Sequence, residues 1–200
     1  GMSKVEPTAD LAGTTVVFMA MAAALGTSTI YLLQPSIAEV AASTGTGIAA
    51  TGVALACAPV GYMLGLLALV PLVDRFPPRN VLGAQFALLG IALALSAVVH
   101  SIGALALLIA VTGACSVVGA GLSSIASRLT RPERRATNLG IVTAGISAGI
   151  LAGRIVGGWL AEQLGWRAML LTFASACGAF AISCWTFLPI TRGAVRGGYL

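Results

Sequence analysis

Charged residues are scarce in this sequence. Only 8% of its 200 residues are charged, whereas 58% are hydrophobic. Soluble domains carry about 25% charged residues on average, because their surfaces must be solvated by water. So low a charge content excludes an ordinary soluble domain and predicts an integral membrane protein surrounded by the lipid bilayer.

Groups that perform enzyme chemistry are also few. The sequence has one histidine, and none of its six acidic residues falls inside a long apolar run. Its four cysteines lie inside such runs without CxxC or Cys/His spacing, which argues against a metal site or a disulfide framework. A phosphate-binding glycine loop, an HExxH motif and a nucleophile elbow are missing. We therefore predict no enzyme activity, no metal and no organic cofactor.

Six apolar runs are present, each near the 20 residues that a spanning helix needs. They cover 11–33, 47–70, 81–99, 104–126, 138–161 and 168–190. The fold class predicted is thus an all-α membrane protein, with one transmembrane domain over 11–190. Residues 1–10 form an N-terminal tail, in which Gly1 before Met2 is interpreted as a cloning remnant, and 191–200 form a C-terminal tail or the start of a central linker.

The basic residues predict the orientation of these spans. The net charge is +5, but the arginines lie mostly in short segments between the runs, so we interpret them as topology signals and predict no nucleic-acid partner. Nine of the eleven fall on one side, the opposite loops hold only Arg167, and Arg154 lies inside the fifth run. The positive-inside rule then places both termini in the cytoplasm, for a multi-pass protein of the cell (inner) membrane.

An internal repeat appears when the chain is shifted by 88 positions. The coinciding pairs are Gly52 and Gly140, Gly61 and Gly149, Gly65 and Gly153, Leu72 and Leu160, Asp74 and Glu162, Arg79 and Arg167, and Leu82 and Leu170. Repeat one covers about 11–99 and repeat two about 104–190. Because an odd number of spans separates them, the two three-helix units have inverted topology, an arrangement typical of secondary transporters.

The fifth run combines a glycine ridge with a single charge. Gly145, Gly149, Gly153 and Gly157 recur every four residues, so they share one helix face and let a neighbouring backbone approach closely. Arg154 lies among them, where a charge costs at least ~2.5 kcal/mol and normally faces a bundle interior or a watery cavity. Its partner is an anionic group of the substrate, a carboxylate from outside these six runs, or carbonyls and hydroxyls of the fourth run; otherwise it is a structural charge that snorkels.

The loop after the second run carries a family resemblance. It reads VPLVDRFPPRNVL, and Leu72, Asp74, Arg75 and Arg79 match the loop motif of the major facilitator superfamily, here most similar to the bacterial drug and sugar efflux branch. The resemblance implies that this motif forms a cytoplasmic gate, with Asp74 helping to latch that side closed against a second six-helix half. If the loop instead is only solvated, its charges merely set the orientation.

The fifth run resembles the antiporter motif of the same family. Its glycines match at every position, while Arg154 stands where the family has proline; the matching residues are Gly140, Gly149, Gly153, Gly157 and Gly158. The resemblance implies export of a small organic solute, such as a drug or sugar, by alternating access, with the proton gradient driving antiport. Segments 31–35 and 131–135 also look like efflux-family signatures.

Polar residues of the first and fourth runs complete the candidate substrate cavity. Thr112, Ser116 and Ser123 lie on one small and polar face of the fourth run, and Gln34 follows the first run. Together with Arg154 they border a cavity, or else the small side chains only permit helix packing and bond their own carbonyls.

The length of the chain leaves two functions open. The family has twelve spans in two six-span halves, so we expect a fragment whose C-terminal six-helix half follows Leu200, or a half-size protein that pairs with a second copy. As a transporter half, the chain would bind a small-molecule substrate. The alternative is a non-transporting six-helix scaffold that dimerises through its glycine-rich faces.

Overall fold

The computed structural model describes residues 11–188, and every regular element in that range is a helix. Six helical segments of this part are long and apolar enough to cross a membrane. They confirm the predicted all-α membrane fold. The two predicted tails, and the last residues of the sixth predicted span, lie outside the described residues.

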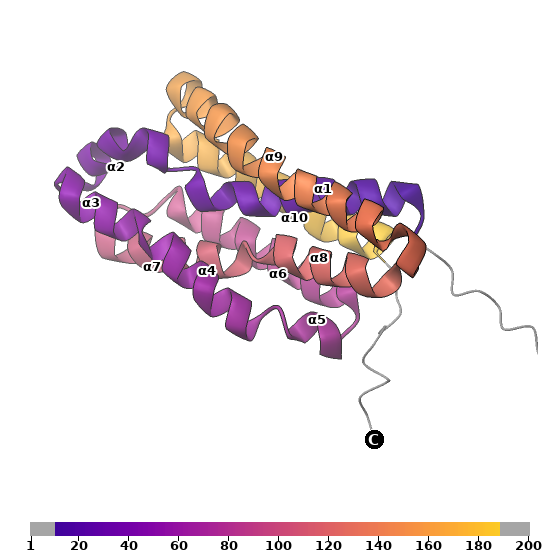
Figure 1. Cartoon of the computed structure of the whole chain (residues 1–200). Helices are drawn as coiled ribbons and strands as arrows, with labels where there is room; N and C mark the ends of the chain where they lie inside the picture. The colour runs from indigo at the N-terminus through magenta and orange to yellow at the C-terminus, as the bar shows by residue number, and fades with distance from the viewer. Residues whose placement is uncertain (1–10, 189–200) are drawn as a thin grey trace, which may run out of the picture.

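Several of the six segments are built from more than one helix (Figure 1). Segment one comprises α1 (Gly13–Ser28), η1 (Thr29–Tyr31), η2 (Gln34–Ser36) and α2 (Ile37–Thr44); segment two comprises α3 (Ile48–Leu55), α4 (Cys57–Ala68) and α5 (Leu72–Arg75); segment three is α6 (Pro78–Ser96); segment four comprises α7 (Ile102–Cys115) and α8 (Val118–Leu129); segment five is α9 (Pro132–Leu164); and segment six is α10 (Trp166–Phe187).

Segment one is longer than predicted. The first two apolar runs, 11–33 and 47–70, imply a loop over 34–46, and this prediction is largely wrong. The apolar run stops at Gln34 and Pro35, but the chain continues as helix to Thr44. Pro35 lies in the first turn of η2, where its missing N–H costs no hydrogen bond. Val40 and Ala41 of α2 are then buried, so packing continues the segment beyond the point at which hydropathy falls.

Segment five also begins earlier than its hydropathy indicates. The predicted start was Asn138, whereas α9 begins at Pro132 and includes Glu133, Arg134 and Arg135. A hydropathy window detects the lipid-facing part of a helix only. The polar turns of α9 extend the helix beyond its apolar stretch, with proline at the first helical position.

The helices pack in pairs that follow the inverted repeat. Figure 1 shows α1 along α9, α4 along α7, and α6 beside α10. The repeat relates segments one, two and three to four, five and six, so the α1–α9 pair corresponds to the α7–α4 pair and the α6–α10 pair corresponds to itself. Fully buried residues such as Met19, Leu82, Phe86, Leu122 and Leu170 form the core between these pairs.

Glycines equivalent in the repeat make equivalent contacts. A Cβ added at Gly61 of α4 would overlap the backbone carbonyl of Ala110 in α7. A Cβ added at Gly149 of α9 would overlap the carbonyl of Ala24 in α1. Both helix pairs therefore depend on backbone contact at glycine, as expected where lipid gives helices no hydrophobic reason to associate.

Two arginines equivalent in the repeat each bind the C-terminal end of the helix that carries the other. Arg79, the second residue of α6, donates from Nη2 to Leu188 O just beyond α10, at 3.0 Å. Arg167, the second residue of α10, donates from Nη1 to Ala97 O at 2.9 Å and Val99 O at 2.8 Å, just beyond α6. A cation at a helix C-terminus satisfies free carbonyls and opposes the negative end of the helix dipole. The third helix of each repeat is thus capped at its C-terminus by an arginine of the other repeat.

We expect Arg167→Gln to lower the thermal midpoint of the protein in detergent by about 6–12 °C. Hydrogen bonds to charged groups contribute about 1.5–3 kcal/mol each, and the guanidinium also stacks on Trp166 at 4.3 Å. Arg134→Gln is the matched control, because Arg134 is exposed on α9 and makes no ion pair within residues 11–188. Equal midpoints for the two variants would contradict the capping role.

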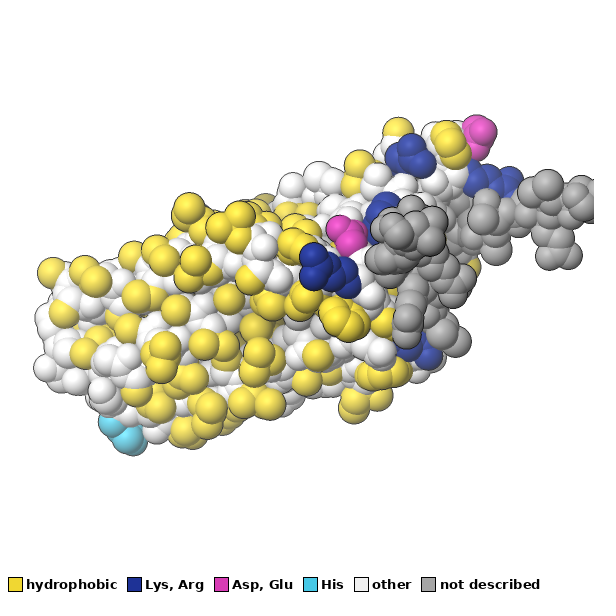
Figure 2. Space-filling view, turned by 90° about the horizontal axis from the view of Figure 1, so that it is seen from below, with side chains coloured by type: hydrophobic (Ala, Val, Ile, Leu, Met, Phe, Trp, Pro, Cys, Tyr) yellow, Lys and Arg dark blue, Asp and Glu magenta, His cyan; other side chains and the backbone are white. Residues whose placement is uncertain are grey.

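Charge is concentrated at one end of the bundle. Figure 2 shows dark-blue basic side chains and acidic ones together at that end, the lone histidine at the other, and hydrophobic side chains between them. We call it the arginine-rich end; its described arginines are Arg75, Arg79, Arg128, Arg131, Arg134 and Arg135. Exposed apolar side chains such as Leu67 and Leu151 lie on the flanks, as they would against lipid or a second helical unit.

Candidate functional site

The first segment of each repeat is broken where the two segments meet. Segment one passes from α1 into η1 at Thr29, and segment four is interrupted at Ser116 and Val117 between α7 and α8. The hydroxyls of Thr29 and Ser116 lie 2.7 Å apart in a buried hydrogen bond. Each hydroxyl also lies within hydrogen-bond distance of a carbonyl of its own helix, Thr29 of Gly26 O at 2.7 Å and Ser116 of Thr112 O at 2.6 Å. Both carbonyls accept backbone N–H bonds as well, so the hydroxyls link the two helix ends to each other.

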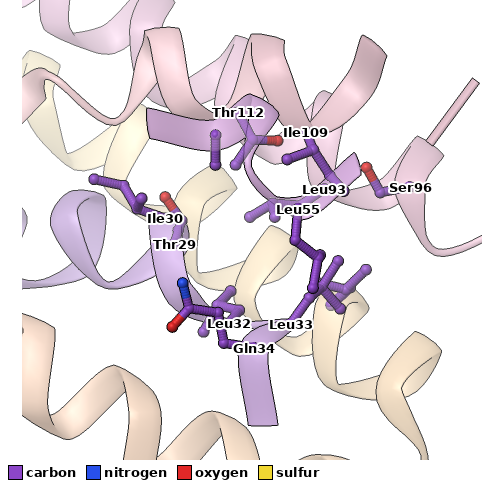
Figure 3. A pocket seen from close by; sticks show the side chains of 12 residues that line it. Thr29, Ile30, Leu32, Leu33, Gln34, Leu55, Leu93, Ser96, Ile109 and Thr112 are labelled. Atoms are coloured by element: carbon purple, nitrogen blue, oxygen red, sulfur yellow. The ribbon is translucent and has the colours of Figure 1, made fainter. Parts of the chain in front are cut away.

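A small cavity lies beside this meeting point (Figure 3). It has a volume of about 20 Å³, room for about one water molecule. Thr29 and Gln34 border it from the broken first segment, Thr112 from α7 and Ser96 from α6. The rest of its lining is apolar. A space of this size holds no organic solute. Larger hollows lie elsewhere on the described residues: one of about 500 Å³ between α6 and α10, and one of about 460 Å³ bordered by Glu39 and Glu162.

The structure brings only some of the predicted cavity residues together. Gln34 and Thr112 line the same cavity, and Ser116 lies next to it through its bond with Thr29. Ser123 is half-buried on α8 and Arg154 lies on α9; neither lines this cavity.

Arg154 of α9 contacts the same helix break of segment one, at Tyr31. Its guanidinium carbon is 4.8 Å from the centre of the Tyr31 ring, and Tyr31 belongs to η1. The side chain is exposed and makes no hydrogen bond or ion pair within residues 11–188. Within the described part of the chain, the guanidinium of Arg154 therefore interacts with an aromatic ring and with no hydrogen-bond acceptor or acid.

The antiporter-like glycines follow segment one through its break. An added Cβ at Gly153 would lie 2.6 Å from Ser28 Cβ, at Gly157 it would lie 3.1 Å from Leu32 Cδ2, and at Gly158 it would lie 3.6 Å from Pro35 Cβ. With Gly149 on Ala24, four motif glycines thus lie against segment one. Gly140, the fifth, has nothing within 4 Å.

The loop that carries the predicted gate motif is held by Arg128 at the arginine-rich end, through two contacts. Asp74 Oδ1 pairs with Arg128 Nη1 at 3.2 Å, and Arg128 Nη2 donates to Val73 O at 3.1 Å. Leu72 is half-buried against the core, whereas Arg75 is exposed. The sequence singled out Arg128 for topology alone. Its position at the end of the fourth span gave no sign that it would hold the loop between segments two and three.

These features define a helical membrane protein of the secondary-transporter type, built from two inverted three-helix repeats with broken first helices. A sequence model of the Major Facilitator Superfamily matches residues 16–197, and the chain belongs to this family.

Its relatives carry the names of transporters rather than enzymes. The chain is 30% identical over 194 residues to the putative uncharacterized transporter YgaY of Escherichia coli K12, covering 97% of this chain and 49% of that protein. It is 35% identical over 179 residues to the probable transporter SCO4007 of Streptomyces coelicolor, covering 90% and 42%. The chain thus spans about half the length of the curated relatives it matches.

The fold also has a solved counterpart. A bacterial homologue of the human lysosomal transporter Spinster, crystallised in an inward-facing and unoccupied conformation, superposes with a TM-score of 0.74 at 14% identity. The match covers 90% of this chain and 44% of that one. At this identity the likeness concerns the fold alone.

Proposed function

We propose that the chain is one six-helix half of a secondary active transporter that exports a small organic solute, such as a drug or a sugar, by alternating access with proton antiport. The protein lies in the inner membrane, with the arginine-rich end and both termini in the cytoplasm. Its partner is a C-terminal six-helix half or a second copy.

The meeting of two broken helices carries this proposal. Alternating access needs packed elements that pivot about a fixed point, and discontinuous helices border substrate sites in transporters with inverted repeats. Thr29 and Ser116 join the two breaks through a single pair of hydroxyls. The glycine contacts hold α1 and α9 in close backbone contact, so that the two helices move as one packed unit.

The location of acidic groups bears on the coupling ion. Glu39 and Glu162 lie at one end of the bundle and Asp74 and Glu133 at the other, and none of these four lies in the apolar middle of a segment. A proton-coupled cycle needs an acid or another titratable group that changes protonation within the membrane. We therefore place the coupling acid in the second six-helix unit.

An efflux assay tests the proposal. The complete transporter would be reconstituted in proteoliposomes loaded with a panel of labelled sugars and of cationic, neutral and anionic drugs, with and without a pH gradient. We expect at least one solute to leave these proteoliposomes faster than it leaves loaded liposomes without protein. We also expect the efflux rate to rise when the solution outside the vesicles is more acidic than the lumen. Exit that ignores the pH gradient would contradict antiport, and no protein-dependent exit of any panel member would count against export.

A further inference from the structure

We infer that Arg154 is an anion-binding residue of the transport pathway and that the exported solute therefore carries a carboxylate, sulfonate or phosphate group. This inference rests on the proposed function, because it assigns a substrate class to the same protein. It depends on four properties of Arg154: its depth, its lack of a polar partner, its position at the helix break and its contact with Tyr31.

Arg154 lies deep in its segment. It is ten positions before Leu164, the end of α9, and 22 positions after Pro132, its start, so at least about 15 Å of helix lies on either side of it. A guanidinium at that depth either faces water or meets an opposite charge, because lipid solvates neither its charge nor its N–H groups.

The described helices supply no polar partner for Arg154. Its hydrogen-bond donors meet no acceptor within residues 11–188. Glu162, the acid nearest to it along α9, is eight residues further on, or about 12 Å of helix rise. The positive charge is thus uncompensated within this six-helix unit, and its exposed position leaves the charge open to whatever enters beside it.

The described contact of the Arg154 guanidinium is aromatic: Tyr31 of η1 lies under it. Gln34, one turn further along segment one, is exposed. Tyr31 and Gln34 both belong to the break of segment one. Broken helices with freed backbone groups are where transporters of inverted-repeat design place their solutes.

The contact with Tyr31 leaves the donors of Arg154 available for an oxyanion. The ring lies 4.8 Å from the guanidinium carbon and takes none of its N–H groups into a hydrogen bond, and the edge of a guanidinium matches a carboxylate, sulfonate or phosphate with two parallel hydrogen bonds. A neutral sugar has no charge to offset the cost of desolvating this cation. The competing explanation is a permanent ion pair with a carboxylate of the second six-helix unit, which would neutralise Arg154 in every state.

A labelling experiment separates these explanations without knowledge of the solute. Leu151 is 64% exposed and one turn before Arg154 on α9, so its side chain is a close neighbour. In the complete transporter, with accessible native cysteines replaced by alanine, Leu151→Cys would be treated with two thiol reagents of opposite charge: the sulfonate MTSES and the trimethylammonium MTSET. The ratio of their two rates cancels any change in the thiolate fraction.

The ratio of the MTSES rate to the MTSET rate is divided by the same ratio for a small thiol in solution, because a thiolate reacts faster with the cationic reagent even without a neighbouring charge. We expect this corrected ratio to be about ten in the parent, and Arg154→Gln to return it to about one. Arg154→Lys should retain the parent's ratio, since the charge remains, and Arg135→Gln, which removes an arginine at the arginine-rich end, should leave it unchanged. Folding of each variant is checked by size-exclusion chromatography.

Two results would overturn the inference. A ratio in the parent equal to that of a small thiol in solution would mean that a carboxylate neutralises Arg154, and reaction with neither reagent would mean that this face meets lipid instead of water. The efflux panel is read separately: export of a panel member without anion preference refutes only the anion site, whereas anion preference without export of any panel member counts only against the proposed export.

Discussion

Replacing Gly149 with valine is expected to lower the stability of the bundle by about 3 kcal/mol or more, or to prevent its folding, whereas Gly140→Val on the same helix is expected to change little. A Cβ at Gly149 would lie 2.5 Å from Ala24 Cα and closer still to the Ala24 carbonyl. Overpacking costs about 1–3 kcal/mol when side chains can yield, but here the neighbour is backbone of a packed helix. At Gly140 nothing lies within 4 Å.

The pair of variants isolates packing from helix propensity. Both substitutions put the same β-branched residue into α9, so any intrinsic effect on the helix is common to both. We would measure the thermal midpoint in detergent, where about 3 kcal/mol corresponds to about 6–12 °C for a domain of this size. Equal midpoints for the two variants would show that α1 and α9 are not in backbone contact.

The inverted repeat extends this prediction to the first repeat. Gly61 lies on Ala110 as Gly149 lies on Ala24, so Gly61→Val should destabilise the protein to a similar degree. A large effect at one position with none at the other would mean that the two repeats do not share this contact.

Features encoded in hydropathy, spacing and the internal repeat were predictable from the sequence. The six spans follow from apolar runs, the glycine ridge from fourfold spacing along one helix, and the equivalence of Gly61 and Gly149 from the repeat at 88 positions. Fourfold spacing fixes a helix face, and glycine on that face permits backbone contact in lipid. The partner of the ridge, α1, could not be identified, because the spacing on one helix does not specify which neighbour it meets.

Features that join distant segments were not predictable. The hydrogen bond between Thr29 and Ser116 spans 87 positions, and the contact from Arg79 to Leu188 O spans 109. The continuation of segment one to Thr44 was missed because Gln34 and Pro35 lower the hydropathy although the helix resumes. In each case, tertiary packing supplied the partner that local sequence signals lack.

Some properties of Arg154 were predictable from the sequence, and its contact with Tyr31 was not. Its depth and the absence of a nearby acid follow from the sequence, and the structure agrees that no described acid pairs with it. The sequence placed Tyr31 only within segment 31–35, which resembles an efflux-family signature. The contact between these two side chains appears only when α9 packs on the broken segment one, and it is this contact that orients the guanidinium.

Removing either member of the Asp74–Arg128 pair is expected to slow export about tenfold, and removing both is expected to slow it no further. Arg128 is the buried partner: its side chain is 22% exposed, against 57% for Asp74, and it also holds Val73 O. An exposed ion pair contributes about 1 kcal/mol or less, but a mostly buried guanidinium that loses its carboxylate loses more. About 1.4 kcal/mol corresponds to a tenfold change in rate.

The reason for the shared effect is that both residues act through one contact. In the structure, Arg128 fastens α5 to the end of segment four, and we expect this fastening to keep Asp74 positioned for the second six-helix unit. Initial efflux rates of Asp74→Asn, Arg128→Gln and the double variant, measured in proteoliposomes, form a double-mutant cycle. Arg134→Gln is the control, since Arg134 lies at the same end outside the gate motif, is exposed and makes no ion pair in the described range. If Asp74→Asn stops export while Arg128→Gln does not, Asp74 acts on the second unit without help from Arg128.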